Sequence, residues 1–319
     1  MKKAIWAWAA VLLFGIAMFS GCRKKPDASE TEESQEPAIS ADSPADFPVE
    51  VNGLTIETVP QKVVVLSPSL AEVVSDMELA AALCGRAEEC DYPEAVASLP
   101  AVGGMLMPDV EAIAELQPDF VLMQSEPAEE LARLFEERGV KVLVIPAASD
   151  WDTLAEMYES VGKAFAGAET GPEKADAFFA SAVEAPMKRI AQMLGDNAGT
   201  LKALYAADGS GSAATGDTLI GVLLEKAGAV NAAAEDTGWT ISADMAVQAE
   251  VIFCPEELVD TVKSAEIYAS SPAVQNGRVY GVDAAVFERQ GKRMAQAAQF
   301  VAGQLYPEAF VISSDVQTI

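Results

Sequence analysis

The amino-acid sequence predicts an α/β protein with two α/β lobes, a long helix that connects them, and a ligand cleft between the lobes. Strand-like and helix-like segments alternate over residues 49–150 and again over residues 199–319, a pattern typical of parallel sheets with helices on their faces. The stretch between them, residues 151–198, contains helix-forming sequence and no strand signal as far as Leu194. Two lobes joined by one connector form a clamshell, and clefts between domains commonly hold ligands.

The first lobe opens with a predicted hairpin, because Asn52 and Gly53 in VEVNGLTIETV favour a tight turn between two strands. The run KVVVLSPS predicts a buried strand, and residues 70–83, LAEVVSDMELAAAL, predict a helix. Pro108 and Pro118 delimit a second helix in PDVEAIAELQPD. The order strand, helix, strand then continues through FVLM, ARLFEERGV and KVLVIPA.

The connector is predicted to be helical. Pro172 suits a first helical turn, and EKADAFFASAVEAPMKRIAQML would extend over about 35 Å at ~1.5 Å per residue. Pro186 is expected to kink this helix, and GDNAG to end it. In the second lobe LKALYAAD, VIFC and RVYGV predict strands, whereas TLIGVLLEKAGA and RMAQAAQFVAGQLYP predict helices.

The N-terminal segment, residues 1–22, has the layout of a secretory signal. Two lysines precede an apolar run that is short for a membrane span, and small residues follow it. Its end, Phe19-Ser20-Gly21-Cys22, resembles the bacterial lipobox, which implies that Cys22 is lipidated and becomes the mature N-terminus. Residues 23–48 are rich in acids, Ser, Ala and Pro, so they predict a disordered acidic tether. We therefore expect an extracytoplasmic protein that is lipid-anchored to the bacterial cell membrane.

Composition excludes several classes of function. The 319-residue chain carries 49 acidic and 21 basic residues, and a net charge of −28 disfavours binding to nucleic acids. It has no histidine, so catalytic sites that depend on histidine and histidine-rich zinc or iron sites are excluded. Cys84 and Cys90 either form a local disulfide or remain unpaired, and Cys254 is expected in the core. Three such cysteines do not form a cluster-binding set, so no metal site, cofactor or enzymatic activity is predicted.

Several segments resemble a known family in order and spacing: KVVVLSPSLAEVV, CDYPEAVASLPAVGG, PDVEAIAELQPDFVLM, GVKVLVIPA, TGDTLIGVLLEKAGAVN and VFERQGKRMAQAAQFV. The chain is similar, from about Val49 to Tyr306, to substrate-binding proteins of bacterial ABC importers, in the branch that carries cobalamin, ferric siderophores and haem. The resemblance implies two lobes on a rigid helical backbone, with little closure on binding. Lys62 departs from the family, which usually has arginine before the first core strand.

The resemblance also implies two acidic residues that dock with arginines of the membrane permease, one on each lobe. Glu111 matches the position on the first lobe. On the second lobe the family commonly has Ser-x-Glu, whereas this chain has Ser242-Ala243-Asp244, so Asp244 is shorter by one methylene. The alternative for both acids is stabilisation of a helix N-terminus.

Loops at the carboxyl ends of the strands are expected to line the cleft. In GGMLMP the glycines let the backbone turn, and Met105 and Met107 offer an adaptable apolar surface, although Met107 can equally fill the core. Tyr92 either contacts the ligand or wedges beside Pro93.

Aromatic and basic residues complete the predicted ligand site. Trp239 is expected to be a flat platform, since the family often has an aromatic residue there, and Trp151 is either a platform or a core wedge. Phe287 and Arg289 are expected at the rim of the second lobe, where Arg289 can pair with ligand carboxylates or phosphates. Arg293 is interpreted as part of a solvated helix start.

The predicted function is capture of a large metal chelate, either a cobalamin-type corrinoid or a ferric siderophore, and its delivery to ABC permease subunits. Haem bound through histidine is impossible, and the few cations near the predicted cleft disfavour an anionic catecholate, so the residues favour a corrinoid slightly. The alternative is a ligand-sensing or adhesion lipoprotein on the same fold, not coupled to transport.

Overall fold

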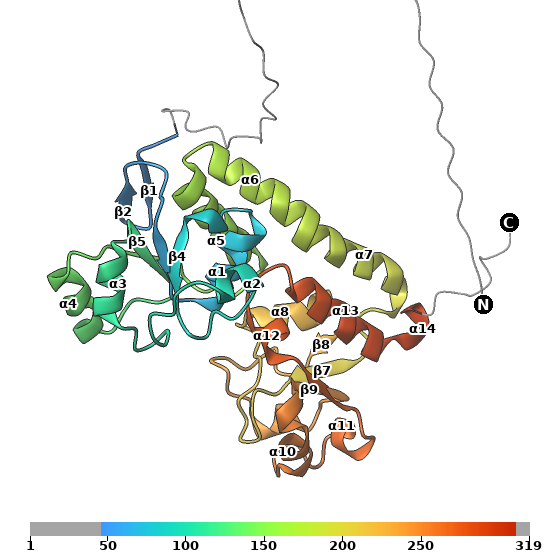
Figure 1. Ribbon diagram of the computed structural model, residues 1–319. Helices are drawn as coiled ribbons and strands as arrows, with labels where there is room; N and C mark the ends of the chain where they lie inside the picture. The colour runs from blue at the N-terminus through green and yellow to red at the C-terminus, as the bar shows by residue number, and fades with distance from the viewer. Residues whose placement is uncertain (1–45, 311–319) are drawn as a thin grey trace, which may run out of the picture. The chain divides into compact units, whose positions relative to one another are not determined.

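The computed structural model describes residues 46–310, which contain both predicted lobes and the connector (Figure 1). No helix in this range combines the length and the apolar character needed to cross a bilayer. The predicted signal segment, the lipidation site Cys22 and the tether up to residue 45 lie outside the described residues, so these remain predictions.

The first lobe is built on a parallel sheet with the strand order β4-β3-β5-β6. Its central strands, β3 and β5, are buried along their whole length, as expected for parallel strands that are covered on both faces. The elements of the lobe are β1 (Val49–Val51), β2 (Leu54–Ile56), β3 (Val63–Val65), α1 (Pro68–Asp76), η1 (Ala80–Ala82), β4 (Leu83–Arg86), α2 (Glu94–Ala97), α3 (Val110–Leu116), β5 (Phe120–Met123), α4 (Glu129–Glu137) and β6 (Val142–Val144).

The prediction of one helix over residues 70–83 is wrong for the second half of that range. α1 ends at Asp76, and Glu78 takes a left-handed conformation with φ of 61°, which reverses the chain. Leu83 then begins β4, which pairs in parallel with β3. The apolar residues after the turn are compatible with either a buried strand or a helix, and their pairing with β3 selects the strand.

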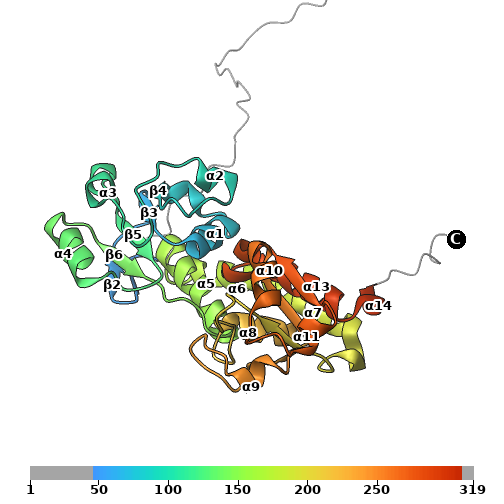
Figure 2. The ribbon, with the colours of Figure 1, turned by 90° about the horizontal axis from the view of Figure 1, so that it is seen from below.

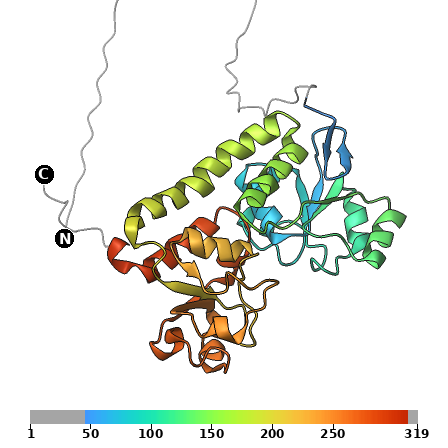
Figure 3. The same ribbon diagram turned by 180° about the vertical axis from the view of Figure 1, so that it is seen from behind.

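The connector consists of helices joined by a turn at residues 167–169: α5 (Trp151–Ala166), α6 (Thr170–Phe178), the π-helical turn η2 (Phe179–Glu184), α7 (Ala185–Leu194) and η3 (Gly195–Asn197). α6, η2 and α7 form one long helix, which packs against α5 at one end and against α13 of the second lobe at the other (Figures 1 and 3). Pro186 lies at the start of α7, and the wide π turn before it accommodates the residue that cannot donate a hydrogen bond.

The second lobe has a parallel sheet with the strand order β10-β9-β7-β8. The two-residue strand β8 was not predicted, because its signal is too short to stand out from the preceding helix. The elements are β7 (Lys202–Tyr205), α8 (Leu219–Lys226), β8 (Val230–Asn231), α9 (Ala243–Ala246), β9 (Val251–Pro255), η4 (Glu256–Leu258), α10 (Val259–Ser264), α11 (Pro272–Gln275), β10 (Val279–Val282), α12 (Ala284–Glu288), α13 (Met294–Leu305) and α14 (Pro307–Phe310).

One hydrophobic core runs through both lobes. Side chains alternate along β7, so Ala203 and Tyr205 join the core that continues through the connector into the first lobe. Leu204 and Ala206 face a smaller cluster on the opposite side of the second sheet. Seen from below, the first lobe, blue to green, and the second lobe, yellow to red, lie side by side with α5 near their junction (Figure 2). The continuous core ties the lobes together by packing.

The cysteines of the described chain are free thiols, so the alternative left open for Cys84 and Cys90 is resolved against a disulfide in this structure. Burial raises the pKa of the Cys90 thiol to about 12, which keeps it protonated and unreactive at neutral pH. Cys254 is buried in strand β9, as predicted.

Candidate functional site

A cavity of about 530 Å³ lies between the two lobes. The first lobe contributes the loop after β6, and the second lobe contributes the loop after β7, the start of α8, the end of α12 and the start of α13. Two other hollows are each lined by residues of a single lobe. We call this site the interlobe cavity; its lining residues are Ala147, Ala148, Ser149, Ala207, Asp217, Thr218, Leu219, Ile220, Trp239, Phe287, Glu288, Gln290 and Met294.

Trp239 is presented to the interlobe cavity by a strained turn. Its φ of 60° is left-handed, a conformation that costs a bulky residue of the order of 1–3 kcal/mol. The turn is fixed because the Trp239 amide donates to the Thr215 hydroxyl over 3.2 Å and the Trp239 carbonyl accepts from the Ala213 amide over 3.0 Å. The residue is 39% exposed. A strained, held and partly exposed aromatic residue is suited to contact a ligand.

Phe287 forms part of the cavity wall from a buried aromatic stack. Its ring stacks on Tyr205 at a centroid distance of 5.6 Å and on Phe253 at 6.3 Å. The Tyr205 hydroxyl donates to Glu288 over 2.7 Å. Burial raises the pKa of Tyr205, so the hydroxyl stays protonated and holds the neighbouring carboxylate in place.

Gln290 of the second lobe joins the first lobe at the edge of the cavity. Its side-chain amide donates to the Ala148 carbonyl over 2.7 Å, and its oxygen accepts from the Ala148 amide over 2.8 Å. The same oxygen accepts from Gln124 over 3.1 Å, and the Gln290 backbone amide donates to the Ser69 hydroxyl over 3.1 Å. This pattern satisfies both ends of the amide and fixes one wall of the cavity.

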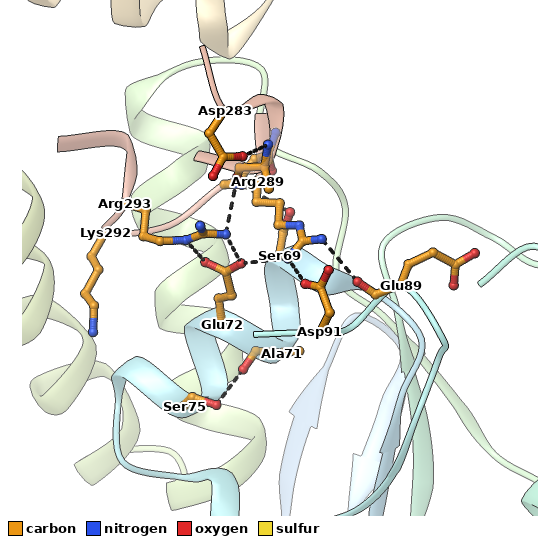
Figure 4. Close-up of polar contacts among 12 residues, drawn as sticks. Ser69, Ala71, Glu72, Ser75, Glu89, Asp91, Asp283, Arg289, Lys292 and Arg293 are labelled. Carbon is orange, nitrogen blue, oxygen red and sulfur yellow. Dashed lines mark hydrogen bonds and ion pairs between the residues drawn. The ribbon is translucent and has the colours of Figure 1, made fainter. Parts of the chain in front are cut away.

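Next to Gln290, a network of ion pairs centred on the buried Glu72 joins the lobes (Figure 4). Glu72 on α1 is 1% exposed and accepts two hydrogen bonds from Arg293, of 2.7 Å from Nε and 2.5 Å from Nη2. Arg289 reaches the same carboxylate over 3.4 Å and donates to Asp91 over 2.5 Å and to the Glu89 carbonyl over 3.2 Å. The Arg289 hydrogen bond holds the pKa of the Asp91 carboxyl below its usual range.

One face of α1 therefore receives the segment 289–293 of the second lobe. Ser69, Glu72 and Asp76 are spaced by three and four residues, which places them on one side of the helix. Asp76 pairs with Lys292 over 2.6 Å, and although this ammonium favours the carboxylate, burial still raises the pKa of Asp76 above its usual value. We call Ser69, Glu72, Asp76, Asp91 and the segment 289–293 the interlobe junction.

The sequence matches the family described as periplasmic binding protein over residues 63–286, which is more than half of the chain. The chain belongs to the periplasmic binding protein family. It is 27% identical over 326 residues to an uncharacterized ABC transporter substrate-binding lipoprotein, YvrC, of Bacillus subtilis (strain 168), covering 97% of this chain and 99% of that protein.

It is also 27% identical over 243 residues to a cobalamin-binding protein of Halobacterium salinarum (strain R1), covering 73% of this chain and 64% of that one. Among solved structures, the periplasmic haem-binding protein RhuT from Roseiflexus sp. RS-1, in apo form, superposes with a TM-score of 0.65 at 20% identity, over 78% of this chain and 99% of that chain. These findings confirm the predicted two-lobed α/β fold and the predicted family.

Of the ligand residues predicted from sequence, this binding protein brings Trp239 and Phe287 together in the interlobe cavity. Met105 and Met107 lie on an exposed first-lobe loop, with Met107 86% exposed, and they do not line the cavity. The loop is fixed because the Met105 amide donates to Glu89 over 2.9 Å. Tyr92 lies outside the cavity as well, and its ring faces the Arg293 guanidinium at 4.5 Å.

Two basic residues differ in role from the sequence-based interpretation. Arg293 is not part of a solvated helix start, because it is 9% exposed and pairs with the buried Glu72. Arg289 was predicted to bind ligand anions. Its guanidinium instead donates hydrogen bonds to Glu72, Asp91 and a backbone carbonyl. Glu72 was not predicted from the sequence. The available signal was an acidic residue on the otherwise apolar face of SLAEVV, which indicates a buried charge.

Trp151 begins the connector and is not among the residues that line the interlobe cavity. It packs against Phe179 at a ring distance of 6.1 Å, and the Lys226 ammonium lies 4.8 Å from its ring. Of the two alternatives left open for this residue, the structure favours packing.

The two predicted docking acids are both exposed in the first turn of a helix. Glu111 lies in α3 and pairs with Arg138, and Asp244 lies in α9. Among residues 46–310, no group of three or more His, Cys, Asp or Glu side chains is arranged to hold a metal ion.

Proposed function

We propose that the chain is the extracytoplasmic substrate-binding lipoprotein of an ABC importer, and that it captures a large metal chelate, a cobalamin-type corrinoid or a ferric siderophore, and delivers it to the membrane permease. Membership of the periplasmic binding protein family and the relationship to a lipoprotein named as an ABC transporter component support this proposal. It acts by binding, without catalysis. Lipidation at Cys22 would keep it at the membrane.

The interlobe cavity carries the proposal. Its volume of about 530 Å³ lies within the range of about 300–1,000 Å³ that is typical of small-molecule sites. Its lining combines the flat face of Trp239, the ring of Phe287 and the thioether of Met294 with a few polar groups. Such a surface suits a large ring system with polar substituents.

A corrinoid is the favoured cargo within this class. One of the related sequences is a cobalamin-binding protein. The chain has no histidine, so a haem iron would lack its commonest protein ligand. A corrinoid already holds its cobalt in an organic ring and needs only contacts to its faces and amide rim.

Docking to the permease is assigned to Glu111 and Asp244. Each is exposed at the start of a helix, one on each lobe, so both carboxylates are free of the core and can meet cationic partners. Glu111 would exchange its Arg138 partner for a permease arginine.

The test is a titration of residues 23–319 with cobalamin, cobinamide, haem, a ferric hydroxamate and a ferric catecholate. Two of the four tryptophans of the chain, Trp151 and Trp239, remain in this form, so a Trp151→Phe variant makes Trp239 the only reporter. We expect saturable quenching of Trp239 fluorescence by a corrinoid, after correction for absorption by the ligand.

A Trp239→Ala variant should lose at least tenfold in affinity, measured by equilibrium dialysis, because the aromatic face is removed. Met193→Ala, which truncates a similarly exposed side chain on α7, is the matched control and should leave affinity unchanged. Absence of binding to every probe by the folded protein would contradict the proposed function.

A further inference from the structure

The charged side chains that line the interlobe cavity are all acidic. Asp217 and Glu288 line it, and neither lysine nor arginine is among its lining residues. An inference about ligand charge follows from this arrangement, and it rests on the function proposed above. A binding protein for anions would instead present arginine or lysine to its ligand.

Asp217 is held as a carboxylate at the mouth of α8. It accepts hydrogen bonds from the Thr215 hydroxyl over 2.5 Å and from the Gly238 amide over 3.0 and 3.1 Å. These hydrogen bonds lower the pKa of Asp217, with the largest effect from Thr215, so the carboxyl group is ionised at neutral pH. Because Asp217 directly precedes the N-cap Thr218, it also offsets the partial positive charge that the N-terminus of α8 directs into the cavity.

Glu288 contributes the second negative charge. One of its oxygens accepts from Tyr205, and within the described residues the other has no hydrogen-bond partner. The side chain is exposed, so the second oxygen is available to a ligand. Together the two carboxylates flank the aromatic surface of the cavity, one at the start of α8 and one at the end of α12.

The cations of the segment 289–293, which follows Glu288 in the chain, are already paired with acids. Arg289, Lys292 and Arg293 are all taken up at the interlobe junction, where Glu72, Asp76 and Asp91 supply one acid for each. The surrounding protein is strongly acidic as well, with a net charge of −28. An anionic ligand would therefore meet like charges with no counter-cation, whereas a cationic ligand would find two carboxylates.

From these observations we infer that the ligand of the interlobe cavity is a cationic metal complex, and that Asp217 and Glu288 select it against neutral and anionic complexes of the same size. The class includes corrinoids with a net positive charge and hydroxamate complexes that carry a free ammonium group. Catecholate complexes and macrocycles with ionised propionates fall outside it.

The experiment uses two series of probes in which the charge changes while the iron-binding or corrin core stays the same. The first is a ferric trihydroxamate with a free amine, an acetylated amine or a succinylated amine, which is positive, neutral or negative. The second is aquacyanocobinamide, dicyanocobinamide and dicyanocobyric acid, which follow the same order. Affinity for residues 23–319 is measured by equilibrium dialysis, with the absorbance of the complex as readout.

We expect affinity to fall from the positive to the negative member of the series that binds, by about tenfold or more at low ionic strength. The difference should shrink when salt rises from about 0.05 M to about 0.5 M, because exposed charges are screened. In the double variant Asp217→Asn with Glu288→Gln, the three members should bind with affinities within about threefold of each other. Asp260→Asn, which neutralises an exposed acid on α10 outside the cavity, should keep the wild-type order.

Equal or tighter binding of the negative member would overturn the inference and leave the proposed function standing, since a chelate would still be captured. Retention of the full charge order in the double variant would also overturn it. If no member of either series binds to the folded protein, the proposed function fails, and the inference fails with it.

Discussion

At the scale of single residues, Glu72 is the most informative side chain in the structure. A carboxylate inside a hydrophobic helix face is costly to bury unless it is paired and hydrogen-bonded. Glu72 meets this condition with Arg293, whose guanidinium also lies over the Tyr92 ring. Because its partners come from the other lobe, Glu72 can be buried with its charge paired only when the two lobes are in this relative position.

We expect Glu72→Gln to lower the free energy of unfolding by about 3 kcal/mol, because it leaves the buried Arg293 without a counter-charge. The measurement is equilibrium unfolding in urea, with far-UV circular dichroism as readout. The matched control is Glu111→Gln, which breaks an ion pair whose glutamate side chain is 67% exposed and should cost little. Equal losses in the two variants would contradict a stabilising role for the buried pair.

At the scale of elements, the contact between α5 and α6 positions the connector. Gly162 and Gly171 let the two helix backbones touch, since a Cβ built on Gly162 would lie 2.3 Å from the Gly171 carbonyl oxygen. No larger residue fits at this crossing. The long helix formed by α6, η2 and α7 then carries this position to the second lobe, where it packs on α8 and α13.

Gly162→Ala should therefore destabilise the protein by about 2 kcal/mol or more, because the helices have to move apart. Gly303→Ala is the control, since Gly303 is also helical but has no atom within 4 Å of the added methyl group. That substitution should stabilise by about 0.5–1 kcal/mol through helix propensity alone. Thermal unfolding of both variants is the measurement, and a neutral Gly162→Ala would show that the crossing is less tight than described.

At the scale of the whole molecule, the folded body extends further towards the N-terminus than the predicted boundary at Val49. The Asp46 carboxylate accepts from the Thr170 hydroxyl over 2.6 Å and from the Glu169 amide over 3.2 Å, at the start of α6. The Asp46 carbonyl accepts from the Ala168 amide over 2.9 Å. The end of the predicted tether thus secures the connector.

A form that begins at Ser43 should unfold at a higher temperature than one that begins at Val49, and both should bind the same ligand. The Thr170 hydrogen bond lowers the pKa of Asp46 below 3.8, so its stabilisation is present above that pH and is lost as the pH falls through the folded-state pKa. The difference between the two forms should accordingly shrink at acid pH. Unfolding temperatures measured from pH 3 to pH 7, as roughly the relevant window, test this, and identical temperatures at pH 7 would contradict it.

Much of the architecture could be predicted from the sequence because hydrophobic periodicity and helix-terminating residues act over a few neighbours. The hairpin at Asn52-Gly53, both central strands of the first lobe and the strand-free connector follow from such patterns. The boundary between α1 and β4 did not follow, because a left-handed Glu78 leaves no local signal. In the candidate site, Trp239 and Phe287 were predicted, whereas Asp217, Glu288 and Gln290 were not.

The sequence by itself determined the fold class, the family, the acidic charge and the absence of histidine chemistry, since each is a property of composition or local pattern. Only the tertiary structure decided that Arg293 pairs with Glu72, 221 residues away in the chain. It likewise decided that Arg289 pairs with Glu72 and Asp91 at the interlobe junction. Contacts between distant segments depend on how the connector packs and where the lobes meet, and no local sequence pattern encodes which distant residues come into contact. The same packing places the carboxylates of Asp217 and Glu288 in one cavity with Trp239, an arrangement on which the proposed selectivity for cationic ligands depends.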